Sequence, residues 1–232
     1  VGFFLNVILT TLNSRYTHMS LSLRYLKSAL EPLQTSVHVE LMEFTINQPH
    51  EHILRALYET QPDYLCFSVY IWNVEATLKL ASSLKKVLPQ TVILLGGPET
   101  AYNAVHYLEA NNFLDVIVTG EGEHILRNYI ERQAKGETYA VPGLVERRSD
   151  GIISYGKAPL IQLLDSIPFP YEEEALSGHR MLYYEASRGC PYRCAYCLSS
   201  REPGVRVFGL ERVLNDLDKF LKAKVMQVKF VD

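Results

Sequence analysis

Short apolar runs alternate with longer amphipathic segments over the first 135 or so residues. Five runs have the length and β-branched character of buried strands, and they cover 3–10, 36–42, 64–70, 91–95 and 116–118. Between them, helical spacing of apolar residues predicts helices over 18–30, 50–59, 74–88, 99–109 and 122–134, with Thr17 as the first N-cap. Strands that alternate with helices in this way indicate an α/β domain. We expect a doubly wound, five-stranded parallel sheet in flavodoxin-like (Rossmann-type) order.

A different pattern follows this domain. Residues 139–146 and 152–155 alternate apolar and polar positions around a Ser-Asp-Gly turn, which predicts a β-hairpin. Residues 157–179 contain three prolines and an acidic run, as in an extended linker. The remainder predicts a strand at 181–186, a helix at 210–222 and a strand at 225–231, the first βαβ unit of a (β/α) barrel. We therefore expect three parts, comprising residues 1–136, 137–180 and 181–232.

Four predicted loops lie at the carboxyl edge of the sheet, where ligands of such sheets bind. They are 11–17, 68–73, 96–100 and 119–123. Paired glycines in the last two loops allow tight turns or a close approach of the backbone to a ligand. Tyr16, Tyr70 and Trp72 add flat apolar surface. Each feature alone fits ordinary turn chemistry, but together they predict a broad, shallow platform for a large flat cofactor.

Composition indicates an ordinary globular protein, with 47% hydrophobic and 21% charged residues. No apolar run is long enough to span a membrane. With 23 basic and 26 acidic residues, the charge balance gives no sign of nucleic-acid binding. Few cysteines and no recognisable secretory signal favour the cytoplasm. Four arginines surround the cysteine-rich segment near residue 190, either as solvated surface or as a positive field for an anionic cofactor group; they are Arg188, Arg193, Arg201 and Arg206.

Three of the four cysteines, Cys190, Cys194 and Cys197, follow the predicted strand 181–186 in C-x3-C-x2-C spacing. Three thiolates on a four-iron cluster leave one iron open to bind a small molecule. Structural zinc with His179 as fourth ligand is an alternative, although the chain has no second ligand pair. A disulfide to Cys66 is less favoured, because Cys66 lies in an apolar run typical of a buried residue.

The segment from Cys190 to Cys197, with Tyr196 before the last cysteine, resembles the signature loop of radical S-adenosylmethionine (radical SAM) enzymes. The resemblance implies that the three cysteines hold a four-iron four-sulfur cluster and that S-adenosylmethionine binds the open iron. It also implies that Tyr196 lies against the adenine of S-adenosylmethionine through its backbone. An electron donor such as flavodoxin or ferredoxin would drive cleavage to a 5′-deoxyadenosyl radical.

The first 135 or so residues resemble the cobalamin-binding domain of one large radical SAM class. The resemblance rests on residues 96–99 and 120–123, which look like its loops after strands four and five, and on 10–18, which look like a poorly characterised subgroup. It implies cobalamin contacts at Asn13, Ser14, Arg15, Tyr16, Ser68, Tyr70, Trp72, Gly96, Gly97, Pro98, Glu99, Gly120, Glu121 and Gly122. The Asp-x-His-x-x-Gly motif of other cobalamin domains is absent, so we expect no protein histidine on cobalt, and His18 to be a helix residue.

The resemblance implies a cobalamin-dependent radical SAM enzyme, with methyl transfer as the expected reaction. Two alternatives remain open: a radical SAM enzyme whose first domain only docks substrate, and a non-catalytic zinc or iron–sulfur module. The sequence identifies neither a catalytic residue nor the substrate, which is a small molecule or a peptide. About fifty residues do not close a barrel, and the family's glycine-rich motif for the SAM amine is absent. We therefore expect a chain truncated early in the barrel, with weak retention of cluster and S-adenosylmethionine.

Overall fold

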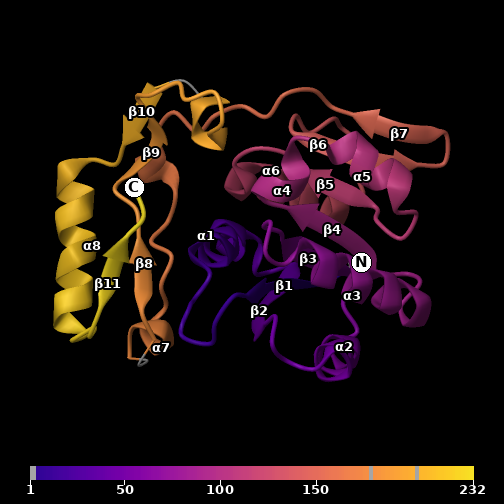
Figure 1. The fold of residues 1–232 in the computed structure, drawn as a ribbon, viewed down its shortest axis with the longest axis horizontal. Helices are drawn as coiled ribbons and strands as arrows, with labels where there is room; N and C mark the ends of the chain where they lie inside the picture. Colours follow the sequence, from indigo (N-terminus) through magenta and orange to yellow (C-terminus); the bar gives the residue numbers. More distant parts are fainter. Residues whose placement is uncertain (1–3, 178–179, 202–203) are drawn as a thin grey trace.

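The computed structural model describes residues 4–177, 180–201 and 204–232 (Figure 1). Its larger part is a seven-stranded sheet in the order β2-β1-β3-β4-β5-β6-β7. The strands are β1 (Leu5–Asn13), β2 (Val37–Thr45), β3 (Tyr64–Ser68), β4 (Val92–Gly96), β5 (Val116–Val118), β6 (Leu144–Arg148) and β7 (Gly151–Ser154). The first five strands are parallel, so the predicted flavodoxin-like order is confirmed. The predicted hairpin is also present, and it extends this sheet as two antiparallel strands.

Helices cover both faces of the sheet. They are α1 (Leu21–Leu30), α2 (His50–Glu59), α3 (Val74–Val87), α4 (Pro98–Ala101), α5 (Ala104–Ala110) and α6 (Gly122–Lys135), with a 3₁₀ turn η1 (Glu31–Leu33). Side chains of β1 alternate between two cores, because successive strand residues point to opposite faces. Ile8 packs with residues of α2, α3 and α5, whereas Val7 and Leu9 pack with residues of α1 and α6. This two-sided burial is the doubly wound arrangement that the apolar runs predict.

Two predicted helices have different boundaries. The first begins at Leu21 instead of His18, because the side chain of Ser20, not Thr17, accepts the hydrogen bond from the Leu23 amide at 3.3 Å. The helix predicted over 99–109 is divided into α4 and α5 by a turn at residues 102–103, where Asn103 favours non-helical backbone. Both differences lie beside the carboxyl edge of the sheet, where loop geometry overrides helical periodicity.

The smaller part contains the predicted strand–helix–strand unit. Strands β8 (Leu182–Tyr184) and β11 (Val228–Phe230) pair in parallel and α8 (Leu210–Lys222) connects them. Between β8 and α8, the cysteine segment is bounded by an antiparallel pair, β9 (Ser187–Cys190) and β10 (Gly204–Val207), which the sequence patterns did not predict. Short helical turns η2 (Leu164–Ser166), α7 (Glu173–Leu176) and η3 (Leu198–Arg201) complete the described elements. In Figure 1 this unit stands beside α1, with its β9–β10 pair toward α4 and α6.

The two parts share buried apolar side chains. Met19, from the loop before α1, packs with Leu182, Tyr184 and Phe220 of the smaller part. Tyr25 of α1 packs with the segment 161–167, so this part of the predicted linker is buried between the two units. Within the described residues, no helix is both long enough and apolar enough to cross a bilayer.

Candidate functional site

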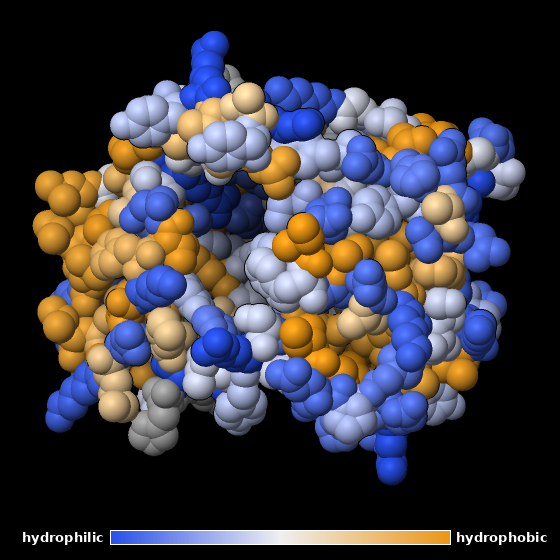
Figure 2. Space-filling model, viewed as in Figure 1, coloured by the Kyte–Doolittle hydropathy of each residue, from blue (hydrophilic) through white to orange (hydrophobic). Residues whose placement is uncertain are grey.

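Two adjoining cavities lie at the carboxyl ends of β3, β4 and β5. The inner cavity, of about 270 Å³, lies between the strand ends and helices α1 and α6, and most of its wall is apolar. The outer cavity, of about 520 Å³, lies between this edge and the cysteine segment. Gly97, Pro98, Gly120 and Glu121 line both cavities. The space-filling view shows a hollow between the two parts of the molecule (Figure 2).

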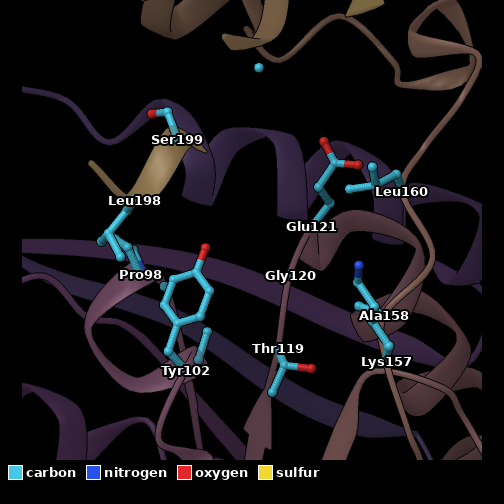
Figure 3. Close-up of a pocket in the computed structure, with 13 residues that line it drawn as sticks. Pro98, Tyr102, Thr119, Gly120, Glu121, Lys157, Ala158, Leu160, Leu198 and Ser199 are labelled. Atoms are coloured by element: carbon cyan, nitrogen blue, oxygen red, sulfur yellow. The ribbon is translucent and has the colours of Figure 1, made fainter. Parts of the chain in front are cut away.

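The outer cavity is walled by both parts of the chain. Pro98 and Tyr102 form one side, and Glu121 and Leu160 form the other (Figure 3). The Tyr102 hydroxyl and the Lys157 amino group point into the cavity. Leu198 and Ser199 of η3 approach from the smaller part, next to the last cysteine. A ligand in this cavity would therefore contact the sheet edge and the cysteine segment together.

The backbone conformation at positions 97 and 120 requires glycine. Gly97 has φ +109°, and a Cβ there would lie 2.4 Å from the carbonyl oxygen of Val69. Gly120 has φ +82°, and its Cβ would lie 2.6 Å from the Cβ of Ala158. Other residues rarely adopt such angles, and these distances are below van der Waals contact. Glycine at these two positions therefore allows the loops to turn as they do. Because glycine has no side chain, backbone atoms form this part of the cavity walls.

Replacing Gly97 with alanine is expected to lower the free energy of unfolding by about 1–3 kcal/mol, because of the left-handed backbone and the close Val69 carbonyl. The neighbouring Gly96→Ala is the matched control, since its Cβ would meet only Val118 at 3.7 Å. Urea unfolding of both variants measures the difference. Equal stability of the two variants would contradict this assignment.

Several predicted site residues lie at the cavities. Ser68 and Tyr70 line the inner one, and the Ser22 hydroxyl lies 3.3 Å from that of Ser68 and 3.2 Å from that of Tyr70. Trp72 stacks on Tyr70 with ring centroids 4.5 Å apart. Gly96 and Gly122 also line the inner cavity. The Gly122 position is close-packed, because a Cβ there would lie 3.0 Å from the side chain of Leu26.

Other predicted residues lie away from both cavities. The Asn13 amide donates to the His18 carbonyl at 3.3 Å, while Ser14, Arg15 and Tyr16 belong to the loop before α1. The Glu99 carboxylate accepts a hydrogen bond from the Tyr107 hydroxyl at 3.2 Å and lies toward α5. Their assignment as cobalamin contacts stays a prediction.

His18 contacts the smaller part of the chain. Its Nδ1 hydrogen-bonds the hydroxyl of Tyr183 on β8, and the two rings stack with centroids 5.9 Å apart. His18 lines neither cavity. It is a loop residue instead of the predicted helix residue, and this contact explains why α1 starts later. The expectation that cobalt receives no protein histidine stays a prediction.

Glu121 is held by an ionic cluster at the junction of the two parts. Its carboxylate accepts from Arg188 at 3.1 Å and from Arg206 at 2.7 and 3.0 Å. Arg188 also pairs with Glu123 and Glu185, at 2.6 Å each. Two of the four arginines expected near the cysteines are thus committed to glutamates, which favours a structural role over a field for an anionic ligand.

The cluster shifts the pKa values of its members. Burial raises the pKa of Glu121, but the hydrogen bonds from Arg206 and the Ile161 amide and the charge of Arg188 outweigh it, so that its pKa is lowered. Burial raises the pKa of Glu185, and Arg188 offsets this only in part, because Glu123 and Glu121 lie nearby. Burial lowers the pKa of Arg188, but Glu123 and Glu185 raise it overall, so this guanidinium stays charged.

Two glutamine substitutions are therefore expected to change stability with opposite dependence on pH. Glu121 stabilises the fold above its ordinary pKa of 4.5, and this is lost as pH falls through its lower folded pKa. The loss of unfolding free energy caused by Glu121→Gln should therefore become smaller in acid. Glu185 binds its proton more tightly when folded, so wild-type stability falls as pH rises from 4.5 through its folded pKa. The free energy of unfolding of Glu185→Gln should therefore increase relative to that of the wild type as pH rises from 4.5. Urea unfolding between about pH 2.5 and 8 covers the folded pKa values on both sides of 4.5 and tests both predictions. Parallel profiles of the two variants would contradict the assignment.

The cysteine segment has the predicted position, following the carboxyl end of β8. Cys190 ends β9, and the Cys197 amide donates to the Cys194 carbonyl at 3.1 Å. All three thiols are half-buried. Within the described ranges, no three side chains of His, Cys, Asp or Glu come together in a group that could hold a metal. Ligation by these cysteines therefore stays a prediction, and so does the adenine contact of Tyr196, which is 93% exposed.

The structure bears on the two alternatives to an iron–sulfur cluster, a disulfide and a zinc site. No disulfide joins any two of the four cysteines, all of which lie within the described residues. Cys66 is buried, as expected, and burial raises its thiol pKa to about 12. His179, the proposed fourth ligand of a zinc site, lies outside the described residues. Three half-buried thiols on one short segment provide the soft donors that an iron–sulfur cluster prefers.

Sequence patterns missed part of the cavity lining. Among the missed residues are Ser22, Leu23, Leu26, Tyr102, Lys157, Ala158, Leu160, Leu198 and Ser199. Residues 157–160 reach the cavity because β7 runs back to the side of the sheet where the carboxyl end of β5 lies. Pairing the predicted hairpin with the last parallel strand would have indicated this position.

A model of the B12 binding domain family matches residues 7–130, more than half of the chain. The chain belongs to the B12 binding domain family. Among curated proteins, the chain is similar to a cobalamin-dependent radical SAM methyltransferase, TokK, from Streptomyces tokunonensis, with 28% identity over 74% of this chain and 27% of that protein. It is also similar to the hopanoid C-3 methylase of Methylococcus capsulatus, with 30% identity over 87% of this chain and 41% of that protein.

A solved structure has the same fold as this chain. The cobalamin-dependent S-adenosylmethionine radical enzyme OxsB, with aqua-cobalamin and S-adenosylmethionine bound, superposes with a TM-score of 0.82 at 23% identity, over 99% of this chain and 34% of that one. This likeness concerns the fold alone. The family model and the two curated relatives confirm the predicted resemblance to radical SAM proteins with a cobalamin-binding domain. The chain spans less than half the length of each of these three proteins.

Proposed function

We propose that the chain binds cobalamin at the carboxyl edge of its sheet and presents it to the cysteine segment of a radical SAM enzyme. The observation that carries this proposal is the continuity of the two cavities. Both are lined by residues 97–98 and 120–121, and the outer one is closed by Gly189, Leu198 and Ser199, which flank the three cysteines. A large flat cofactor on this edge would therefore face the cysteine segment.

The residues present suit a large ligand with both apolar and polar groups. The inner cavity offers an apolar wall with the hydroxyls of Ser22, Ser68 and Tyr70 at one side. The outer cavity offers the Tyr102 hydroxyl and the Lys157 amine. When bound, cobalamin supplies a carrier for a methyl group. The chain itself would orient the cofactor and shield it between its two parts.

The cysteines would hold a four-iron four-sulfur cluster, which supplies the electron for cleavage of S-adenosylmethionine. Methyl transfer to substrate carbon is proposed because two similar proteins are named as a methyltransferase and a methylase. β8, α8 and β11 would form the first unit of a barrel, with the cysteines at the carboxyl end of its first strand. The substrate and a flavodoxin- or ferredoxin-like electron donor belong to the same proposal.

Anaerobic reconstitution with iron, sulfide and methylcobalamin, followed by gel filtration and absorption spectroscopy, tests this function. We expect corrin bands to co-elute with the chain at about one equivalent. Iron–sulfur absorption should accompany them at partial occupancy, in keeping with the weak retention of the cluster expected from the sequence. Iron–sulfur absorption without corrin would instead indicate a docking role for the first domain. A colourless protein that retains zinc would contradict the proposal.

A further inference from the structure

One arginine connects the two parts of the candidate site. Arg188 lies on β9, two residues before Cys190. Its guanidinium contacts Glu121 at 3.1 Å and Glu123 at 2.6 Å, and both glutamates lie at the start of α6. Glu121, Glu123 and Arg188 all line the inner cavity. The strand that leads into the first cysteine is thus joined directly to the loop at the sheet edge.

A second arginine completes the junction. Arg206 on β10 lies opposite Arg188 in the antiparallel register. It donates to both oxygens of Glu121 and, at 2.7 Å, to the carbonyl of Ile161, whose amide donates back to Glu121 at 2.7 Å. Two strands beside the cysteines and the segment after the hairpin therefore converge on one carboxylate.

The cluster is buried and its charges are unequal. The side chains of Arg188 and Glu123 are 13% and 8% exposed, and Glu185 shares the same guanidinium. Three carboxylates face two guanidinium groups, so loss of Arg188 leaves buried negative charge without compensation. Charged hydrogen bonds are directional, whereas the neighbouring apolar contacts of Met19 and Tyr25 are not. The ionic cluster therefore specifies how β9 sits against the sheet edge.

We propose that Arg188 is a positioning residue that couples the cofactor-binding edge to the cysteine segment. A cofactor that orders residues 120–123 also orders β9 through Arg188, and thereby changes the exposure of the thiols that follow. By thermodynamic linkage, the state of the cysteine segment changes cofactor affinity by the same factor. The proposal rests on the cobalamin binding proposed above, but it concerns residues of this chain alone.

Alkylation of the cysteines reports this coupling without a cluster or enzymatic activity. The rates of reaction of Cys190, Cys194 and Cys197 with iodoacetamide would be measured in the dark, with and without saturating methylcobalamin. Free glutathione in the same solution serves as the reference thiol, because Cys66 is buried and lines the inner cavity itself. In the wild type, we expect the cofactor to change the rates of the three thiols by about 5-fold or more, the lower range of measured couplings.

The Arg188 variants separate coupling from simple shielding by the cofactor. Because Arg188 lines the inner cavity, we expect Arg188→Met to bind methylcobalamin more weakly. At a saturating concentration of methylcobalamin, its effect on the alkylation rates should disappear. Arg188→Lys should restore part of the effect, because one ammonium keeps the charge but cannot contact three carboxylates as the guanidinium does. Arg132→Met is the matched control. It removes another buried arginine, which lies in the last turn of α6 and pairs with Glu146 of β6, and it should leave the effect intact.

Other results would overturn either the proposed function or the coupling alone. If methylcobalamin does not bind the wild type, the proposed function fails and the coupling with it. If it binds but leaves the alkylation rates unchanged, or if Arg188→Met retains the full effect, the coupling alone is overturned. If circular dichroism shows that Arg188→Met does not fold, Glu123→Gln takes its place. That variant keeps an acceptor for Arg188 but removes one charge, and is expected to weaken the effect.

Discussion

Replacing Cys190, Cys194 and Cys197 together with serine is expected to abolish iron–sulfur loading. Serine hydroxyls are poor ligands for iron–sulfur clusters compared with thiolates. Iron and acid-labile sulfide should fall from about four atoms each per fully loaded chain to near zero. Because these cysteines lie outside the inner cavity, cobalamin should still bind.

The matched control for this experiment is Cys66→Ser. Cys66 is a free buried thiol on β3, and its raised pKa of about 12 keeps it protonated at neutral pH. Its replacement should leave the iron content at the wild-type level. Iron retained by the triple variant, or stoichiometric zinc in its place in the wild type, would contradict the assignment of the cluster ligands.

Filling the inner cavity is expected to weaken cobalamin binding by about 100-fold or more. Ser22→Trp places an indole beside Ser68 and Tyr70, in a space of about 270 Å³. Exclusion of one large apolar group of the ligand corresponds to about 2.7 kcal/mol of lost binding free energy. A titration followed by visible absorption would give the dissociation constant.

Ser82→Trp is the control for this substitution. Ser82 is a half-buried residue of α3, and α3 packs on the opposite face of the sheet from α1. The new indole should therefore leave cobalamin affinity unchanged. Equal affinities of the two tryptophan variants would show that the inner cavity takes no part in binding.

The sequence predicted the parallel sheet and its order, because every central strand is buried on both faces and therefore forms a continuous apolar run. The edge loops followed from the rule that ligands bind at the carboxyl ends of parallel strands. The Gly97 and Gly120 positions were correctly placed on that edge. Their side-chain-free backbone is now explained by contacts with Val69 and Ala158.

Features that depend on contacts between distant segments were not predictable in this way. The start of α1 depends on the cap formed by Ser20 and on the contact of His18 with Tyr183, which lies 165 residues further along the chain. Glu121 and Arg188 are typical surface residues by composition, so only the folded chain shows them buried against each other. The strands β9 and β10 lack a clear alternation because glycine and charged residues interrupt their pattern.

The position of cobalt in crystals of the chain grown with cobalamin shows whether the cofactor lies between the sheet edge and the cysteine segment. An anomalous difference map collected at the cobalt absorption edge should show one peak per chain. We expect that peak in the outer cavity, between residues 97–98 and 120–121 of the sheet edge and Gly189 next to the first cysteine. A cobalt peak away from the carboxyl edge of the sheet, or crystals without bound cobalt from saturating cobalamin, would contradict this account.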